Sequence, residues 1–206
     1  MIVRSRHQSP YLADNLLGDP GERDLFVYLP PAYEESDRRF ATAYLLHAYG
    51  QTAETVVTPA TDGERWGPPI EDVLDPVFRR MGVPPMIVVI PDGSSRWGCG
   101  QWVDSPVSGH FGSYVAKDVV AFVDSTYRTI ASARSRGVFG FSSGGMGAWN
   151  IVSQNPDIFA AMAVFSADTF AATRDAVESE VQGARPTQGR PANLARRSTA
   201  SRGPSS

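Results

Sequence analysis

The sequence predicts an α/β fold in which a mostly parallel central sheet is covered by helices. Short apolar runs rich in β-branched residues alternate with stretches of helical period, which is the pattern of such folds. The chain has 206 residues, of which 42% are hydrophobic. This is enough for one domain with a sizeable core and too little for two comfortable ones.

Five apolar runs are the candidate strands. Each is short and nearly continuous in apolar residues, as strands buried on both faces should be. Together they predict the central sheet. The runs are Leu25 to Leu29, Ala43 to His47, Met86 to Ile90, Gly137 to Phe141 and Ala161 to Phe165.

Three stretches have the spacing of helices. In Tyr114 to Tyr127 the large apolar residues fall on one stripe, with charged residues off it. Gly145 to Gln154 is expected to end before Pro156, because a residue that precedes proline avoids the α region. Ile70 to Met81 is a weaker pattern, since Pro76 would start or kink a helix there.

The end of the chain differs in kind from the rest. From Gly183 to Ser206 there is no acidic or aromatic side chain, and Leu194 is the only large aliphatic residue. Such a segment buries too little apolar surface to offset its ordering entropy. We therefore expect one folded α/β domain over residues 1–182 and a disordered, solvated tail over 183–206. The residues also leave open a third possibility, that the original reading frame of the gene is lost within this tail.

Charge and composition exclude several classes of function. The formal net charge of −3 gives no electrostatic reason to expect nucleic acid or an anionic membrane as a partner. No long apolar run follows the arginines of the first six residues, so we expect neither a signal peptide nor a membrane span, and a cytoplasmic protein. Cys99 is the only cysteine, which excludes an internal disulfide and disfavours a cysteine-based metal site.

The segment from Gly140 to Gly144 fits the pattern G-x-S-x-G and lies between a predicted strand and a predicted helix. In that context the pattern is typical of a sharp turn that presents a serine hydroxyl above the sheet. The glycines avoid Cβ clashes with the neighbouring strand and helix. We predict Ser142 as a nucleophile and the Ser143 N–H as an oxyanion donor. The alternative is an ordinary Gly/Ser turn leading into a helix.

Two further loops follow predicted strands and should share the same edge of the sheet. The turn "HAYGQT" follows the second strand, and its Tyr49 N–H is the preferred second oxyanion donor, while the His47 ring is expected to brace the turn. The loop after Ile90 is a candidate wall of a substrate pocket. Trp97, Trp102 and Phe111 are candidates to line that pocket, or else to pack the loop on itself.

The order of motifs resembles one family of α/β-hydrolases. The motifs are "VYLPPAY", "YLLHAYGQT", "VVIPDG", "WVDSPVSG", "YVAKDVVAFVDSTYRTI" and "GFSSGGMGAWNIVSQNPDIFAAMAVFSAD", within Leu16 to Phe170. The family contains esterase D and S-formylglutathione hydrolase, feruloyl esterases, enterochelin esterase-like proteins and mycolyltransferases. The resemblance implies an α/β-hydrolase fold and a serine esterase that needs neither metal nor organic cofactor, with Ser142 as its nucleophile.

The sequence departs from this family in two ways. The family usually has His-Gly where this chain has His47-Ala48. More seriously, the family's catalytic acid and histidine lie on later strand ends, and no histidine follows Ser142. The resemblance therefore implies a fold without its last strands and helices, and a catalytic triad without its acid and base.

An earlier histidine is the remaining candidate for the base. His110 lies in a loop at the expected edge and is the best substitute, ahead of His7, whereas Asp168 is an acid without a histidine to orient. Two functions therefore compete. One is a carboxylic-ester hydrolase acting on small-molecule esters, impaired in this chain; the other is a non-catalytic relative that binds a small ligand or partner. The sequence does not predict the oligomeric state.

Overall fold

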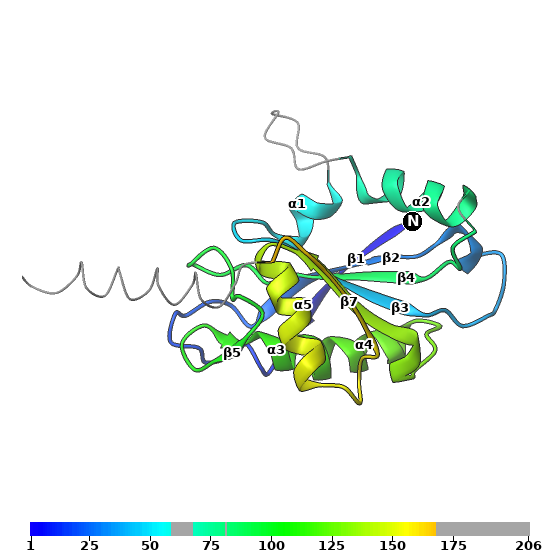
Figure 1. Ribbon diagram of the computed structural model, residues 1–206. Helices are drawn as coiled ribbons and strands as arrows, with labels where there is room; N and C mark the ends of the chain where they lie inside the picture. The colour runs from blue at the N-terminus through cyan, green and yellow to red at the C-terminus, as the bar shows by residue number, and fades with distance from the viewer. Residues whose placement is uncertain (59–67, 81, 168–206) are drawn as a thin grey trace, which may run out of the picture. The chain divides into compact units, whose positions relative to one another are not determined.

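The computed structural model describes residues 1–58, 68–80 and 82–167, and within them a six-stranded sheet forms the centre of the fold (Figure 1). The strand order is β1-β2-β4-β3-β7-β8. All five predicted strands are present, with ends shifted by a few residues, and the N-terminal strand β1 was not predicted. The strands are β1 (Ile2–Gln8), β2 (Glu22–Tyr28), β3 (Thr42–Leu46), β4 (Ile87–Pro91), β7 (Arg136–Phe141) and β8 (Ala161–Phe165).

The part of the sheet that carries Ser142 is parallel, as predicted. β3 pairs with both β4 and β7, and β7 pairs with β8, all in parallel, while β1 and β2 are antiparallel at the other side of the sheet. Leu46 lies opposite Gly140, and Phe141 lies opposite Phe165. The carboxyl ends of β3, β7 and β8 therefore meet at one edge, where loops of α/β folds form their sites.

Helices lie on both faces of the sheet, which gives the three layers of an α/β-hydrolase (Figure 1). On one face lie α1 (Ala53–Val57) and α2 (Ile70–Arg80). On the other lie α3 (Phe111–Ser113), the π-helical stretch η2 (Tyr114–Val119), α4 (Val120–Thr126) and α5 (Ser143–Gln154). Smaller elements complete the described chain: the 3-10 turns η1 (Pro31–Tyr33) and η3 (Ala133–Ser135), and a two-stranded hairpin of β5 (Asp104–Ser105) and β6 (Gly109–His110).

The predicted helices form, although their details differ. The stretch predicted from Tyr114 begins earlier, at Phe111, and runs on through η2 and α4. The helix after Ser142 begins at Ser143 and ends before Asn155, as the following proline requires. α2 continues through Pro76, so this proline does not begin the helix.

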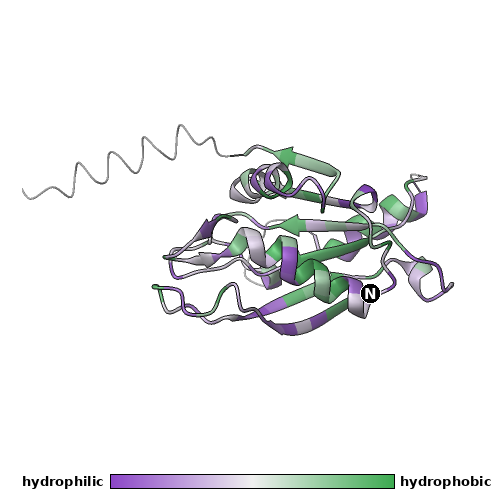
Figure 2. Cartoon of the chain, turned by 90° about the horizontal axis from the view of Figure 1, so that it is seen from below, coloured by the Kyte–Doolittle hydropathy of each residue, from purple (hydrophilic) through white to green (hydrophobic). Residues whose placement is uncertain are grey.

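The core lies on both faces of the inner strands. Along β4, Ile87 and Val89 pack toward α4 and α5, while Val88 and Ile90 pack toward α1 and α2. This alternation is the period-2 geometry of a strand buried on both faces. Figure 2 shows the hydrophobic residues concentrated along the central strands and on the helix faces turned to them.

β8 does not follow that pattern. Its sequence, like that of β4, predicts burial on both faces, yet all five of its residues are exposed. Within the described residues it is one of the two edge strands of the sheet, and its hydrogen-bonded neighbour is β7. The prediction of full burial is therefore wrong for this strand, because a run of apolar residues does not state whether other elements cover the faces of the strand.

Other sequence predictions fall partly outside the described residues. Asp168 and the whole segment 183–206 lie beyond residue 167. In the described ranges, no helix is both long and apolar enough to cross a membrane.

Candidate functional site

Ser142 sits on a sharp turn between β7 and α5, at the carboxyl end of a central parallel strand. Its backbone has φ 55° and ψ −124°, a combination that non-glycine residues rarely adopt. Two hydrogen bonds hold it there: its N–H donates to Phe165 O at 3.0 Å, and its carbonyl accepts from the Met146 N–H at 3.0 Å. The side chain is partly exposed. The turn thus places a partly exposed Ser142 at the carboxyl edge of the sheet, in the strand-to-helix context that the G-x-S-x-G pattern predicts.

The two glycines of the pattern are required by close backbone contacts. A Cβ added at Gly140 would lie 2.4 Å from the backbone of Gly144. A Cβ added at Gly144 would lie 2.0 Å from Leu46 O. Both obstacles are backbone atoms, which cannot rotate away as a side chain can. The predicted steric role of these glycines is confirmed.

The two candidate oxyanion donors follow neighbouring strands. The Ser143 N–H lies in the first turn of α5, where amides have no partner within the helix and the helix dipole favours a negative charge. Tyr49 follows β3, the strand beside β7, and its N–H has no acceptor among the described residues. The tyrosine ring packs over Gly98, so closely that a Cβ there would lie 2.6 Å from it.

His47 braces the turn that carries Tyr49, as the sequence predicts. The ring is buried and makes two hydrogen bonds: Nδ1 lies 2.9 Å from Ala48 O, and Nε2 accepts from the Gly93 N–H at 2.8 Å. These partners assign the proton to Nδ1, since a carbonyl needs a donor. Burial lowers the pKa of His47 below its ordinary value of 6.5. His47 is therefore a neutral structural residue with no nitrogen left for Ser142.

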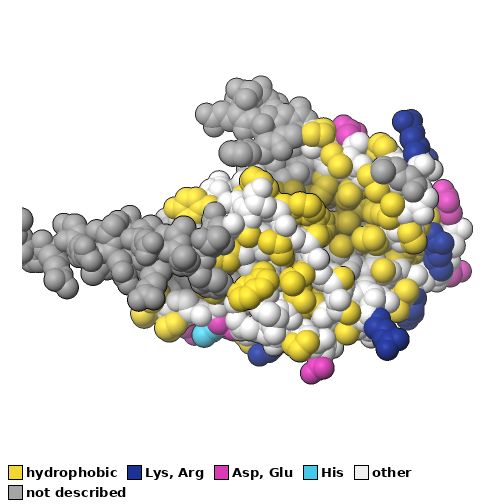
Figure 3. All heavy atoms as spheres, in the orientation of Figure 1, with side chains coloured by type: hydrophobic (Ala, Val, Ile, Leu, Met, Phe, Trp, Pro, Cys, Tyr) yellow, Lys and Arg dark blue, Asp and Glu magenta, His cyan; other side chains and the backbone are white. Residues whose placement is uncertain are grey.

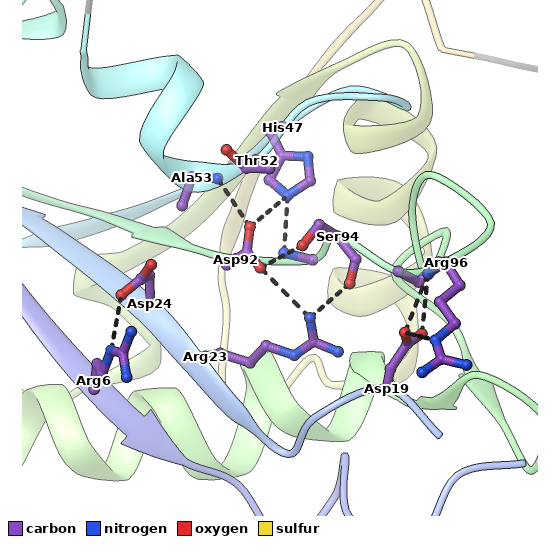
Figure 4. A network of polar contacts seen from close by, with 12 residues as sticks. Arg6, Asp19, Arg23, Asp24, His47, Thr52, Ala53, Asp92, Ser94 and Arg96 are labelled. Atoms are coloured by element: carbon purple, nitrogen blue, oxygen red, sulfur yellow. Dashed lines mark hydrogen bonds and ion pairs between the residues drawn. The ribbon is translucent and has the colours of Figure 1, made fainter. Parts of the chain in front are cut away.

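Asp92 extends this bracing to the loop after β4 (Figure 4). Its carboxylate accepts from the Ala53 N–H at 3.0 Å and from Ser94 Oγ at 2.6 Å, and it lies 3.7 Å from His47 Nε2. Arg23, also buried, donates to Ser94 O at 2.8 Å and lies 3.6 Å from Asp92. The network thus fixes both loops beside Ser142. In the sequence only Asp92 stands out, as a charged residue directly after an apolar run, whereas Arg23 lies between Glu22 and Asp24 and predicts no buried partner.

The three aromatic residues predicted to line a pocket fall into two groups. The Trp97 side chain is 60% exposed and remains a candidate contact for a substrate. Trp102 and Phe111 are 0% exposed, and their rings pack against each other at 6.4 Å. These two rings have no surface to offer a substrate, so they support the loop from inside, which was the alternative considered for them.

Neither of the other two histidines contacts Ser142 in the described structure. His110 is exposed on β6, and its ring makes no hydrogen bond or ion pair with the described residues around Ser142. His7 lies on β1, 3.0 Å from Asp118, and packs against the Phe122 ring at 4.8 Å. Among the described residues, the edge thus brings together Ser142 and the amides of Ser143 and Tyr49, and no histidine contacts the serine.

Beside Ser142, the surface over β7 and β8 is apolar and open. Phe141 and Phe165, on the paired ends of these strands, are 50% and 54% exposed. Nearer the amino ends, residues of β3, β7 and β8 line a hollow of about 370 Å³. Figure 3 shows hydrophobic side chains gathered in a hollow on this face. The hollow lies at the amino ends of these strands, whereas Ser142 follows the carboxyl end of β7. A substrate of Ser142 would therefore not bind in this hollow.

Comparison with known proteins agrees with this geometry. The family described as "Putative esterase" matches residues 20–199. A curated relative, endo-1,4-beta-xylanase Y of Acetivibrio thermocellus, is 25% identical over 161 residues, which are 73% of this chain and 14% of that protein. Esterase MT1326 of Mycobacterium tuberculosis is 29% identical over 127 residues, which are 59% of this chain and 24% of that protein.

Solved structures of esterases share the fold. A ferulic acid esterase superposes with a TM-score of 0.64 at 23% identity, covering 81% of this chain and 58% of that one. An S-formylglutathione hydrolase from Agrobacterium tumefaciens has a TM-score of 0.59 at 25% identity, with the same coverage of 81% and 58%. The chain thus spans less than two thirds of the length of the relatives it matches.

Proposed function

The chain belongs to the esterase family of α/β-hydrolases, and on that premise we propose that it is a serine hydrolase acting on carboxylic esters of small molecules. The observation that carries the proposal is the strained backbone of Ser142 at the carboxyl end of β7. Strain of this kind persists only where the surroundings enforce it, and it clusters at functional sites. The tight contacts of Gly140 and Gly144 are what enforce it here.

In the proposed reaction, Ser142 Oγ attacks the ester carbonyl and the carbonyl oxygen becomes an oxyanion. In this proposal the N–H groups of Ser143 and Tyr49 donate to that oxygen, and the exposed Trp97 is a candidate to contact the substrate. The alcohol leaves with a proton, and water then releases the acid from the acyl-serine. The chemistry needs neither a metal nor an organic cofactor, but it needs a base to take the serine proton.

The base is the weak part of this site in the 206-residue chain. His47 has both ring nitrogens engaged, and His7 is paired with Asp118. His110 is exposed and is the only surrogate left among the three histidines. We therefore propose that this chain hydrolyses esters weakly. The same observations favour a second candidate, a non-catalytic relative that binds a small ligand or partner.

Two measurements on the purified chain test the proposal. A fluorophosphonate, which bonds to a serine oxygen with loss of fluoride, is expected to label Ser142 slowly, with the site found by peptide mass spectrometry. Turnover of a short-chain aryl ester is expected to stay near the ~10³–10⁴ over water that binding and an oxyanion hole alone provide. Ser142→Ala should remove the label and change this trace turnover little; Ser125→Ala, at an exposed serine of α4, is the control.

The outcomes separate the candidates. Robust turnover lost equally in Ser142→Ala and His110→Ala would identify His110 as the base. Removing any one residue of a catalytic unit lowers the rate to the same residual value. Robust turnover lost only in Ser142→Ala would point to a different base. No label at Ser142 and no turnover above the variants would favour the binding protein over the esterase.

A further inference from the structure

Trp102 occupies an unusual place in the loop that follows β4. Its side chain is 0% exposed, and its backbone has φ 55°, next to Gln101 with φ 54°. Two successive non-glycine residues in the left-handed region cost free energy, which contacts elsewhere must offset. The contacts that Trp102 makes on its two sides indicate what the strained turn achieves.

On one side Trp102 holds the turn that carries Tyr49. Its Nε1–H donates to His47 O at 3.1 Å, and its ring meets the His47 ring edge to face at 5.0 Å. The ring also covers Gly93, where an added Cβ would lie 2.5 Å from it. Gly93 in turn donates its N–H to His47 Nε2. Trp102 thus contacts two groups of the turn. One is His47 O, two residues before Tyr49, and the other is Gly93, which is hydrogen-bonded to the His47 ring.

On the other side Trp102 holds α5, the helix that begins at Ser143. Its carbonyl accepts from Asn150 Nδ2 at 3.2 Å. Its Cβ and ring lie against Gly147, where an added Cβ would be 2.4 Å from the Trp102 Cβ. Asn150 and Gly147 are one turn apart on the buried face of α5.

We propose that Trp102 is a positioning residue that sets the separation between the N–H groups of Tyr49 and Ser143. One end of the residue is bonded to the turn of the first donor and the other to the helix of the second. A tryptophan is the side chain that supplies both a ring wide enough to span this gap and a donor for the His47 carbonyl. The inference rests on the proposed function, since it assigns a role within that oxyanion hole.

Trp102→Phe tests the inference, because it keeps an aromatic ring and removes the Nε1–H. The first readout is amide hydrogen exchange at Ala48, Gln51 and Gly93, whose N–H groups are bonded within the braced turn. Loss of one buried donor is expected to speed exchange there about five- to tenfold. Unchanged exchange at these amides would overturn the proposal.

Tyr114→Phe is the matched control. Tyr114 is equally buried, its ring packs on Phe111 at 6.4 Å, and its hydroxyl has no partner among the described residues. It should leave exchange in the turn unchanged. Equal acceleration of amide exchange in Trp102→Phe and Tyr114→Phe would contradict the proposal, because Trp102 would then act as any other buried aromatic residue does. If Trp102→Phe does not fold, Asn150→Ala releases the same loop from α5 and should speed exchange at the same amides.

The second readout is the rate of fluorophosphonate labelling of Ser142. Trp102→Phe should slow labelling about tenfold, less than the ~10²–10³ that loss of a whole oxyanion donor costs. Tyr114→Phe should label as the parent chain does. A parent chain that takes no label would remove the proposed esterase function, and the exchange data would still decide whether Trp102 sets the turn.

Discussion

The two sides of Ser142 differ in how many buried, hydrogen-bonded side chains support them. On the side of β3, which we call the oxyanion side, His47, Asp92 and Trp102 are buried and hydrogen-bonded to one another's loops. On the side of β8, Phe141 and Phe165 lie exposed. Among the described residues, the turn at Ser142 is hydrogen-bonded to that side through the Ser142 N–H, which donates to Phe165 O.

This difference teaches which part of a serine site is local. The donors for an oxyanion come from backbone amides next to the serine and on the adjacent strand, so a short stretch of sequence supplies and braces them. A base must be brought from another strand end. The backbone donors proposed for the oxyanion are therefore braced within the described residues, whereas no described histidine contacts Ser142.

The largest expected effect lies on the oxyanion side. Gly144→Ala places a Cβ 2.0 Å from Leu46 O, and neither backbone can yield without parting β3 from the turn. We expect a loss of more than about 4 kcal/mol in the free energy of unfolding, the range of severe overpacking and strain. Urea denaturation, or failure to recover folded protein, measures it.

Gly50→Ala is the control for this substitution. Gly50 has φ +75° and nothing within 4 Å of an added Cβ, so only backbone strain of about 1–2 kcal/mol is expected. Equal losses in the two variants would mean that the contact between the turn and β3 is looser than the structure has it.

A smaller effect on the same side is a loss of stability in acid. The neutral His47 ring accepts from the Gly93 N–H, and burial lowers its pKa below 6.5, against the raising effect of Asp92 and with the lowering effect of Arg23. The unfolded chain therefore binds a proton more readily than the folded one. This stabilisation is fully present above pH 6.5 and is lost as the pH falls toward the lowered pKa of the folded state.

The slope of this loss approaches about 1.4 kcal/mol per pH unit for a single proton. Urea denaturation at several pH values between 7 and 5 measures it. His47→Asn should flatten the profile in this window, because it removes the group whose pKa burial lowers. A parent profile that does not fall below pH 6.5 would contradict the buried neutral ring.

The sequence predicted the parallel strands, the sharp turn at Ser142 and its glycines, because each rests on local rules. Buried strands need apolar runs, and a crowded turn needs residues without a Cβ. Ser142 and Gly144 were assigned on those grounds, and the structure places both as expected. The bracing role of His47 followed in the same way from its place at a strand end.

The sequence could not predict what depends on contacts between distant segments. Trp102 and Trp97 lie in the same loop, and nothing in their spacing says that one is buried and the other exposed. The partners of Trp102 on α5 are far along the chain, at Gly147 and Asn150. For the same reason, an apolar run such as Ala161–Phe165 predicted a strand correctly and its burial wrongly.

The smallest expected effect lies on the β8 side. Phe165 is 54% exposed, and its contribution to the turn at Ser142 is its carbonyl, which accepts from the Ser142 N–H whatever the side chain is. Phe165→Ser should therefore change the free energy of unfolding by no more than about 0.5 kcal/mol. Phe159→Ala, at a ring that is 1% exposed, should cost about 3–5 kcal/mol in the same urea titration. If Phe165→Ser costs as much as the buried control, the β8 side is covered in solution and the contrast between the two sides of Ser142 is lost. If Phe165→Ser lowers the free energy of unfolding only slightly, the side chain of Phe165 does not support the turn at Ser142. β8 then contributes only the backbone hydrogen bond to Ser142, and the oxyanion side provides the packed support.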